Sequence, residues 1–340
     1  MLYLQETNQD TQNTDMIKPI IFGLSGSKLT REETVFFQEN KVVGFILFRR
    51  NIESKEQILQ LTADLKELHP HQDVKVFVDQ EGGRVARLKP PIADKEYPTM
   101  DFFGKIFDSE GEEKACLEIS NNFSNITKML KQFGIDSGCS PVADLNYPYT
   151  HRIIGDRSFG SDVQKVVKSC LASIKAIEEN GGIAIMKHIP GHGRAITDSH
   201  LSLPKVSTSL EDLNSTDFAV FKQLSENRNI AYAMTAHVVF EAIDPELPAT
   251  LSKKVINFIR AELGFKGKLM TDDICMRALH QNIDLTKAED LAHSIGNVTK
   301  LALEAGCDII LHCNGDMLQM QTVVQAVDEI LNLGEISDIS

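Results

Sequence analysis

Short apolar runs of strand length alternate with amphipathic, helix-length segments along almost the whole chain of 340 residues. Eight runs are predicted as strands, at residues 19–24, 42–48, 74–78, 135–145, 182–188, 230–236, 268–271 and 308–312. No linker, composition break or repeat interrupts this order. The alternation predicts an α/β fold, with a single (β/α)₈ TIM-type barrel over residues 17–340. A doubly wound sheet is the alternative, because alternation alone does not count strands reliably.

The segments between the strands carry helix signals. A capping box at Ser54 and Gln57 begins one helix, and residues 112–133 place apolar side chains on one stripe before Gly134. Ser161 and Gln164 are predicted to cap a third helix, and residues 210–224 to form one continuous helix. Residues 1–16 are predicted to be a disordered lead-in.

Charge and cysteine content exclude several classes of protein. The formal net charge of −13 argues against binding to nucleic acids or to anionic membranes. No apolar run approaches the roughly 20 residues that span a bilayer, and the N-terminus lacks a basic start and an apolar core. The six cysteines show no C-x-x-C spacing and several lie on apolar faces, which favours free thiols in a reducing compartment. We therefore expect a cytoplasmic protein.

Polar side chains gather where the predicted strands end. They are Asp79, Asp144, Lys187, His188, His237 and Asp272. Barrel enzymes carry their active sites at the carboxyl ends of the strands. The sequence therefore predicts that these side chains surround one pocket.

The stretch KHIPGHGRAITDSHLSLP, residues 187–204, is the densest in titratable groups. Its glycines and proline predict an irregular loop in which residues 190–200 can swing. Asp198 and His200 lie two residues apart, so in an extended segment the carboxylate can bind the imidazole, select its tautomer and strengthen it as a base. The alternative is a polar loop whose histidines bind nothing.

Two further motifs follow strands. In DQEGGR, Asp79 ends an apolar strand before a glycine pair, although a turn with Glu81 and Arg84 paired in solvent is the alternative. In TDD, one of the adjacent carboxylates Asp272 and Asp273 can face a pocket while the other braces a loop. The alternative is that an Asp caps the N-terminus of a helix, but such a cap would require only one of the two carboxylates.

Taken in order, four motifs resemble those of the glycoside hydrolase family 3 β-N-acetylglucosaminidases of the single-domain, bacterial peptidoglycan-recycling type. They are DQEGGRVARL from Asp79, IGDRSFG from Ile154, KHIPGHG with DSH from Lys187, and MTDD from Met270. The similarity extends over about residues 18–335. Two positions depart from the family pattern: Ala86 replaces a frequent Gln, and KPPIADKEYPTM after Leu88 is irregular.

The resemblance implies a role for each matching position. Asp272 would be the catalytic nucleophile, His200 the general acid/base and Asp198 its partner. The residues that would hold the hydroxyls of N-acetylglucosamine are Asp79, Arg87, Arg157, Lys187 and His188. The implied enzyme is a retaining exo-β-N-acetylglucosaminidase acting on N-acetylglucosaminyl-1,6-anhydro-N-acetylmuramic acid and its peptide-bearing forms, as a monomer without cofactor or metal.

Three other functions stay open from the residues alone. A metal-dependent hydrolase could use His188, His237 and Asp272 as ligands, although the Lys187 cation opposes it. A non-catalytic sugar-binding barrel would not require the Asp198–His200 pair. A phosphorylase of the same fold is closer, because a neutral histidine repels incoming phosphate less than a carboxylate does.

Overall fold

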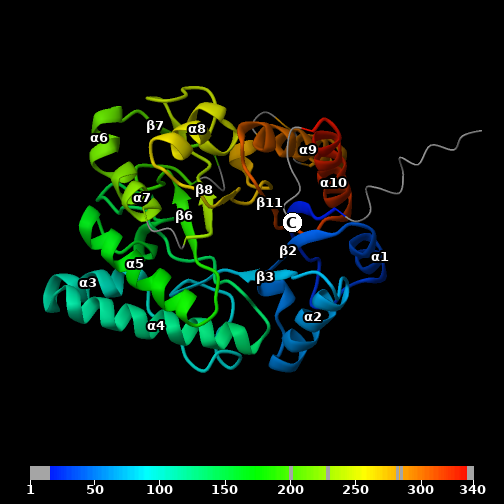
Figure 1. Ribbon diagram of the computed structural model, residues 1–340, viewed down its shortest axis with the longest axis horizontal. Coiled ribbons are helices and arrows are strands. Elements are labelled where there is room, and N and C mark those ends of the chain that lie inside the picture. Colours follow the sequence, from blue (N-terminus) through cyan, green and yellow to red (C-terminus); the bar gives the residue numbers. More distant parts are fainter. Residues whose placement is uncertain (1–15, 199–201, 227–229, 281–282, 284–285, 335–340) are drawn as a thin grey trace, which may run out of the picture.

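The computed structural model describes residues 16–198, 202–226, 230–280, 283 and 286–334. The predicted lead-in therefore lies outside the described residues, apart from Met16. Figure 1 shows short strands in the middle of the molecule and helices around them, which confirms the α/β class. Every described helix is too short or too polar to span a lipid bilayer.

The central strands of the described chain form two parallel sheets. One sheet has the order β11–β1–β2–β3 and the other the order β10–β8–β6. Their bounds are β1 (Lys18–Gly23), β2 (Val42–Leu47), β3 (Lys75–Val78), β6 (Ile185–Ile189), β8 (Tyr232–Thr235), β10 (Lys268–Met270) and β11 (Ile310–His312). All seven coincide with strands predicted from the sequence. Their carboxyl ends point the same way, so residues that follow them meet at one end of the fold.

The segment predicted as the fourth strand, residues 135–145, is not a regular strand. Cys139 has a φ of 48° and Pro141 lacks an amide hydrogen, so a continuous ladder cannot form. The segment still contacts β3 and β6, and a third bridge joins the two sheets on their other side. These isolated parallel bridges are Phe77–Ser137, Val142–Lys187 and Met270–Ile309.

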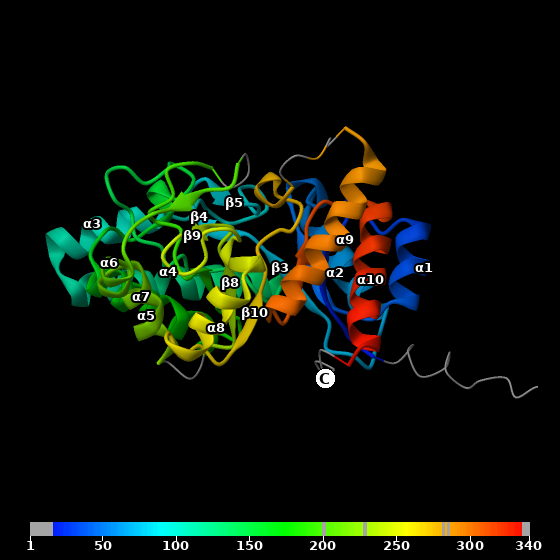
Figure 2. The same ribbon diagram turned by 90° about the horizontal axis from the view of Figure 1, so that it is seen from above.

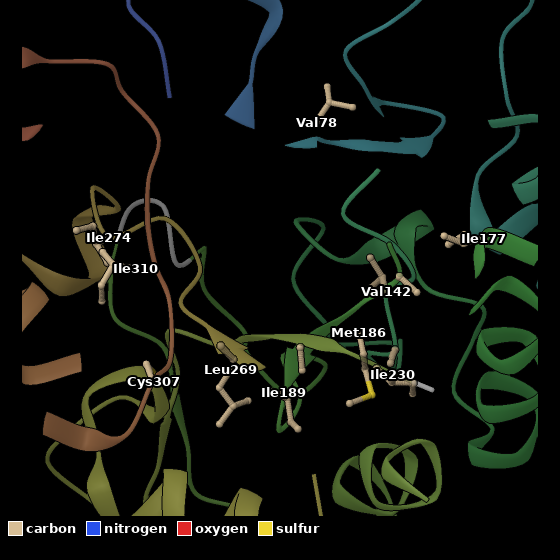
Figure 3. Packing of buried hydrophobic residues seen from close by; sticks show 14 of the residues in the cluster. Val78, Val142, Ile177, Met186, Ile189, Ile230, Leu269, Ile274, Cys307 and Ile310 are labelled. Carbon is tan, nitrogen blue, oxygen red and sulfur yellow. The ribbon is translucent and has the colours of Figure 1, made fainter. Parts of the chain in front are cut away.

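Apolar side chains divide into an inner and an outer cluster. The inner cluster takes side chains from every central strand and from the 135–145 segment: Ile21, Ile46, Phe77, Cys139, Ile185, Met234, Met270, Ile309, Leu311 and Cys313. The outer cluster lies between the strands and the helices and includes Val78, Val142, Met186 and Ile310 (Figure 3). Neighbouring residues such as Ile20 and Ile21 belong to different clusters, because successive side chains of a strand point to opposite faces.

Two small pairs of strands lie outside the central sheets. They are the antiparallel pair β4 (Gln80–Gly82) and β5 (Val85–Ala86), and the parallel pair β7 (Lys205–Val206) and β9 (Val239–Phe240). The β4–β5 turn follows β3 directly and requires glycine. Gly82 has a φ of 112°, and a Cβ there would lie 2.1 Å from the carbonyl oxygen of Pro98.

Helices cover the outside of the strands (Figures 1 and 2). They are α1 (Arg31–Glu39), α2 (Lys55–Glu67), α3 (Met100–Glu110), α4 (Glu112–Gln132), α5 (Val163–Glu179), α6 (Leu210–Ser215), α7 (Asp217–Ser225), α8 (Lys253–Ala261), α9 (Ala288–Ala305) and α10 (Met317–Asn332). Helices α4, α5 and α9 end before glycines with positive φ, namely Gly134, Gly181 and Gly306.

Two helix predictions need correction, and one helix was not predicted. The N-cap of α5 is Asp162, whose side chain accepts from the amide of Lys165, and not Ser161. The helix predicted over residues 210–224 breaks at Thr216, which has φ −128° and ψ −99°. Helix α3 was not predicted, because the stretch KPPIADKEYPT before it has no regular hydrophobic pattern from which to infer where the helix begins. Its N-cap is Thr99, a residue type with a clear capping signal.

Candidate active site

A cleft of about 310 Å³ opens at the carboxyl ends of the central strands. Its lining includes six of the predicted site residues: Asp79, Arg87, Arg157, Lys187, His188 and Asp272. These residues come from the segments after β3 and β10, from β6 and from the loop before α5. A larger cleft of about 1020 Å³ at the opposite ends of the strands, near Pro19 and Asp308, contains none of them.

Five charged side chains form a chain of alternating sign along one side of this cleft. Arg87 Nη2 lies 2.8 Å from Asp79 Oδ2, and Lys187 Nζ lies 3.3 Å from Asp79 Oδ1. The same ammonium lies 2.6 Å from Glu81 Oε1. The Arg157 guanidinium donates to both oxygens of Glu81 at 2.7 Å. Each anion is therefore shared by two cations.

This pairing controls the charge of the carboxylates. Burial alone would raise the pKa of Asp79, but the Lys187 and Arg87 cations lower it well below its ordinary value. Burial opposes ionisation of Glu81 as well, and Arg157 and Lys187 lower its pKa to about 2. Despite burial, the carboxylates raise the pKa of Lys187. Asp79, Glu81 and Lys187 therefore stay ionised at neutral pH, and the charged side chains that line the cleft present fixed donors and acceptors to a polar ligand.

His188 is oriented by a buried carboxylate. Its Nδ1 lies 2.6 Å from Asp144 Oδ2, and Asp144 Oδ1 accepts the backbone amide of His192 at 2.6 Å. Burial opposes the charge of Asp144, but the two imidazoles and the amide of His192 lower the pKa of this carboxyl. An ionised acceptor at Nδ1 makes that nitrogen the protonated one, so Nε2 is the nitrogen available to accept a hydrogen bond.

The adjacent carboxylates Asp272 and Asp273 both line the cleft but make different contacts. Asp272 Oδ1 accepts the backbone amide of Asp273 at 2.8 Å. Asp273 Oδ1 accepts the amides of Cys275 at 2.9 Å and Cys313 at 3.2 Å, and thereby ties the segment after β10 to the end of β11. Burial and the neighbouring Asp272 charge raise the pKa of Asp273 to about 6, although the amide of Cys275 opposes the shift.

His237, two residues after the end of β8, supports the same segment. Its Nε2 lies 3.0 Å from the carbonyl oxygen of Asp273, and its Nδ1 lies 2.7 Å from Thr250 Oγ1. A carbonyl acceptor requires a proton on Nε2. His237 therefore holds backbone rather than a metal. Within the described residues, no group of three or more His, Cys, Asp or Glu is arranged to bind a metal ion.

The loop after β6 holds one half of the predicted acid/base pair. Asp198 is described and half-buried, and its carbonyl accepts the amide of Ser202 at 3.0 Å. His200 lies outside the described residues.

The first half of the loop predicted to swing, residues 190–200, is anchored by contacts to other segments, and the swing itself stays a prediction. Thr150 Oγ1 donates to the carbonyl of Gly193 at 2.5 Å, and Arg194 Nε lies 2.7 Å from Asp217. Gly193 permits a close approach of two backbone segments, since a Cβ there would lie 2.2 Å from the carbonyl oxygen of Leu145. Exposure begins at Ile196, which is 65% exposed.

Three residues that hold other site residues in place were not identified as such from the sequence: Glu81, Asp144 and Asp273. Glu81 does not pair with Arg84 in solvent; Arg84 binds Asp156 instead, at 2.9 Å. A signal was present, because Asp79 and Glu81 lie two residues apart on an extended segment and so share a face. Asp144 and Asp273 carried only strand-end and paired-carboxylate signals, which do not reveal their partners.

Sequence comparison relates nearly the whole chain to one family. The profile of the glycosyl hydrolase family 3 N-terminal domain matches residues 10–338. A protein named beta-hexosaminidase from Alkalilimnicola ehrlichii is 34% identical over 300 residues, which cover 88% of this chain and 81% of the relative. Another beta-hexosaminidase, from Neisseria gonorrhoeae, is 35% identical over 297 residues, or 87% of this chain and 78% of the relative.

Solved structures agree. The crystal structure of NagZ from Neisseria gonorrhoeae in complex with N-trifluoroacetyl-D-glucosamine superposes with a TM-score of 0.79 at 32% identity, covering 93% of this chain and 85% of that one. A glycoside hydrolase family 3 beta-N-acetylglucosaminidase from Paenibacillus sp. gives a TM-score of 0.80 at 30% identity, covering 94% of this chain and 58% of that one.

Proposed function

This chain belongs to glycosyl hydrolase family 3 and is a β-N-acetylhexosaminidase, and we propose that it is a retaining exo-β-N-acetylglucosaminidase acting on peptidoglycan fragments. The observation that carries the proposal is the cleft itself. It combines one strand-end carboxylate, Asp272, with the chain of fixed donors and acceptors from Arg87 to Arg157 and with His188. A sugar needs both a nucleophile at its anomeric carbon and several partners for its hydroxyls.

The proposed reaction has two steps. Asp272 attacks the anomeric carbon and forms a glycosyl ester, while His200 gives a proton to the departing glycosidic oxygen. A water molecule then gives a proton to His200 and attacks the same carbon, which releases Asp272 and the sugar with retained configuration. Asp198 orients the imidazole. The amide of Asp273, 2.8 Å from Asp272 Oδ1, holds the nucleophile in place.

The remaining cleft residues would bind the terminal sugar. Asp79, Arg87, Arg157, Lys187 and His188 would contact its hydroxyls, because they line the cleft and are held by ion pairs and hydrogen bonds with one another, with Glu81 and with Asp144. A volume of about 310 Å³ lies at the lower end for small-molecule sites, roughly 300 to 1,000 Å³, and favours one sugar over a long oligosaccharide. The aglycone would be anhydro-N-acetylmuramic acid with or without peptide.

We further infer that the strands close into a (β/α)₈ barrel as one domain. Three observations support closure: the 135–145 segment bridges β3 and β6, Met270 bridges to Ile309 beside β11, and the inner apolar cluster draws on all eight strand positions of the described chain. Barrel interiors are filled by such inward-pointing side chains. A cytoplasmic monomer is our proposal for its location and assembly, and its six free thiols favour the reducing compartment.

Covalent trapping tests the mechanism. A 5-fluoro N-acetylglucosaminyl fluoride should glycosylate the enzyme and release fluoride, because the ring fluorine slows both steps and the good leaving group spares the first. Peptide mapping should find the label on Asp272; a label elsewhere, or none, would refute the proposal. Product analysis with and without phosphate separates hydrolysis from phosphorolysis, and we expect free N-acetylglucosamine in both cases.

A further inference from the structure

Glu81 joins two residues of the cleft without lining the cleft itself. Its side chain is 2% exposed, and its carboxylate receives Arg157 through two bonds of 2.7 Å and Lys187 through one of 2.6 Å. Oε1 is the shared atom, since it accepts both Lys187 Nζ and Arg157 Nη2. Both cations line the cleft.

Without the Glu81 charge between them, Arg157 and Lys187 repel each other. Burial lowers the pKa of Lys187 and the Arg157 charge lowers it further, whereas Glu81 is the strongest influence that raises it. Lys187 is also only 2% exposed, so solvent stabilises its charge little. Its second carboxylate, Asp79, is farther away at 3.3 Å and is shared with Arg87. Removing the Glu81 charge would therefore leave two buried cations competing for space and for one remaining anion.

We propose that Glu81 is the positioning residue that sets the hydroxyl specificity of the cleft, a role that rests on the proposed N-acetylglucosaminidase function. It fixes the directions of the Arg157 and Lys187 donors, so that a hydroxyl of the terminal sugar meets them without reorganisation. Glu81 acts only through these two residues. Its effect therefore appears in the discrimination among sugars and not in the protonation chemistry.

A substrate cycle tests this role. The rate constant kcat/KM is measured for nitrophenyl β-N-acetylglucosaminide and for its 3-, 4- and 6-deoxy forms, with the wild type and with Glu81→Gln. For at least one position, the wild type should lose about 10- to 100-fold on removal of the hydroxyl, the range for a hydrogen bond to a charged group. On the parent glycoside, Glu81→Gln should have a kcat/KM lower than that of the wild type by a similar factor. For this variant, removal of the same hydroxyl from the substrate should lower kcat/KM by no more than about threefold.

Controls separate positioning from general destabilisation. Asp136→Asn removes another buried acid, paired with Lys131 at 2.9 Å and remote from the cleft, and should lower Tm while keeping every wild-type deoxy penalty. Glu81→Asp keeps the charge, should recover part of the discrimination, and replaces Glu81→Gln if that variant does not fold. Unchanged deoxy penalties in the Glu81 variants, or a wild type indifferent to all three hydroxyls, would overturn the proposal. A wild type inactive on the parent glycoside would instead overturn the proposed function.

Discussion

Asp144 and His188 form a buried pair in which imidazole Nδ1 lies 2.6 Å from carboxylate Oδ2. The same carboxylate accepts the amide of His192. One acid therefore orients a ring that lines the cleft and anchors the start of the loop that carries Asp198.

We expect Asp144→Asn to lower kcat/KM by roughly 10- to 100-fold. The Asn side chain has an N–H group that can face Nδ1 of His188, which carries a proton in the wild type, so the ring is no longer held in one tautomer. Imidazole ¹⁵N shifts should show His188 protonated at Nδ1 in the wild type and a mixture of tautomers in the variant. Asp244→Asn is the control, a buried acid that binds Ser252 away from the cleft. Unaltered His188 shifts in Asp144→Asn would contradict this account.

Asp272 and Asp273 should separate activity from stability. Asp272→Ala should abolish measurable turnover with little change in Tm. Asp273→Ala should lower the free energy of unfolding by about 1 to 3 kcal/mol, because the amides of Cys275 and Cys313 lose their acceptor. Steady-state kinetics and thermal melts of both variants check this; a dead Asp273→Ala beside an active Asp272→Ala would reverse the two roles.

Gly193→Ala should damage the anchored half of the loop. The new Cβ would lie 2.2 Å from the carbonyl oxygen of Leu145, so the backbone must move, at a cost of about 1 to 3 kcal/mol in stability. The shift would displace Asp198 and lower kcat. Gly26→Ala is the control, since a Cβ there meets nothing within 4 Å. Equal melting temperatures and rates for the two variants would mean that this contact does not hold the loop.

His312 should contribute to acid lability. Burial lowers its pKa to about 4 from an ordinary value of 6.5, so the folded protein keeps the ring neutral where the unfolded chain takes up a proton. Between pH 6.5 and 4 the unfolded state binds more protons than the folded state. The contribution of neutral His312 to the free energy of unfolding is therefore fully present above pH 6.5 and is lost as pH falls toward 4. The free energy of unfolding should fall by about 3 kcal/mol over this range through His312 alone.

Urea denaturation at pH 4.5, 5.5 and 7 measures this dependence. His312→Phe should flatten the decline between pH 6.5 and 4, because phenylalanine keeps an aromatic ring beside Phe22 and cannot titrate. A variant that loses stability with acid as steeply as the wild type would show that His312 is not responsible.

Chelation should leave catalysis unaffected. Both proposed steps use a carboxylate and an imidazole, and His237 is occupied by Thr250 and the carbonyl of Asp273. Activity after dialysis against EDTA should equal that of a sample dialysed without it. Loss of activity that zinc restores would favour a metal-dependent hydrolase.

Much of the fold was accessible from local patterns. Apolar runs of four to seven residues located the seven central strands, and glycines located the ends of α4, α5 and α9, because burial and backbone geometry act on neighbouring residues. The break at Thr216 and the irregular 135–145 segment were missed. Both depend on how a segment packs against distant elements, which no local period records.

The sequence by itself determined the order of strands and helices, the strand-end positions of Asp79, Lys187 and Asp272, and the motifs that mark the family. Only the tertiary structure decided the partners of these groups. Glu81 binds Arg157 and Lys187, which are 76 and 106 positions away, and not Arg84, because buried charges require partners of opposite sign within a few ångströms. The same holds for the loop after β6: glycines allow motion or close approach equally well, and the carbonyl of Leu145 beside Gly193 selects close approach.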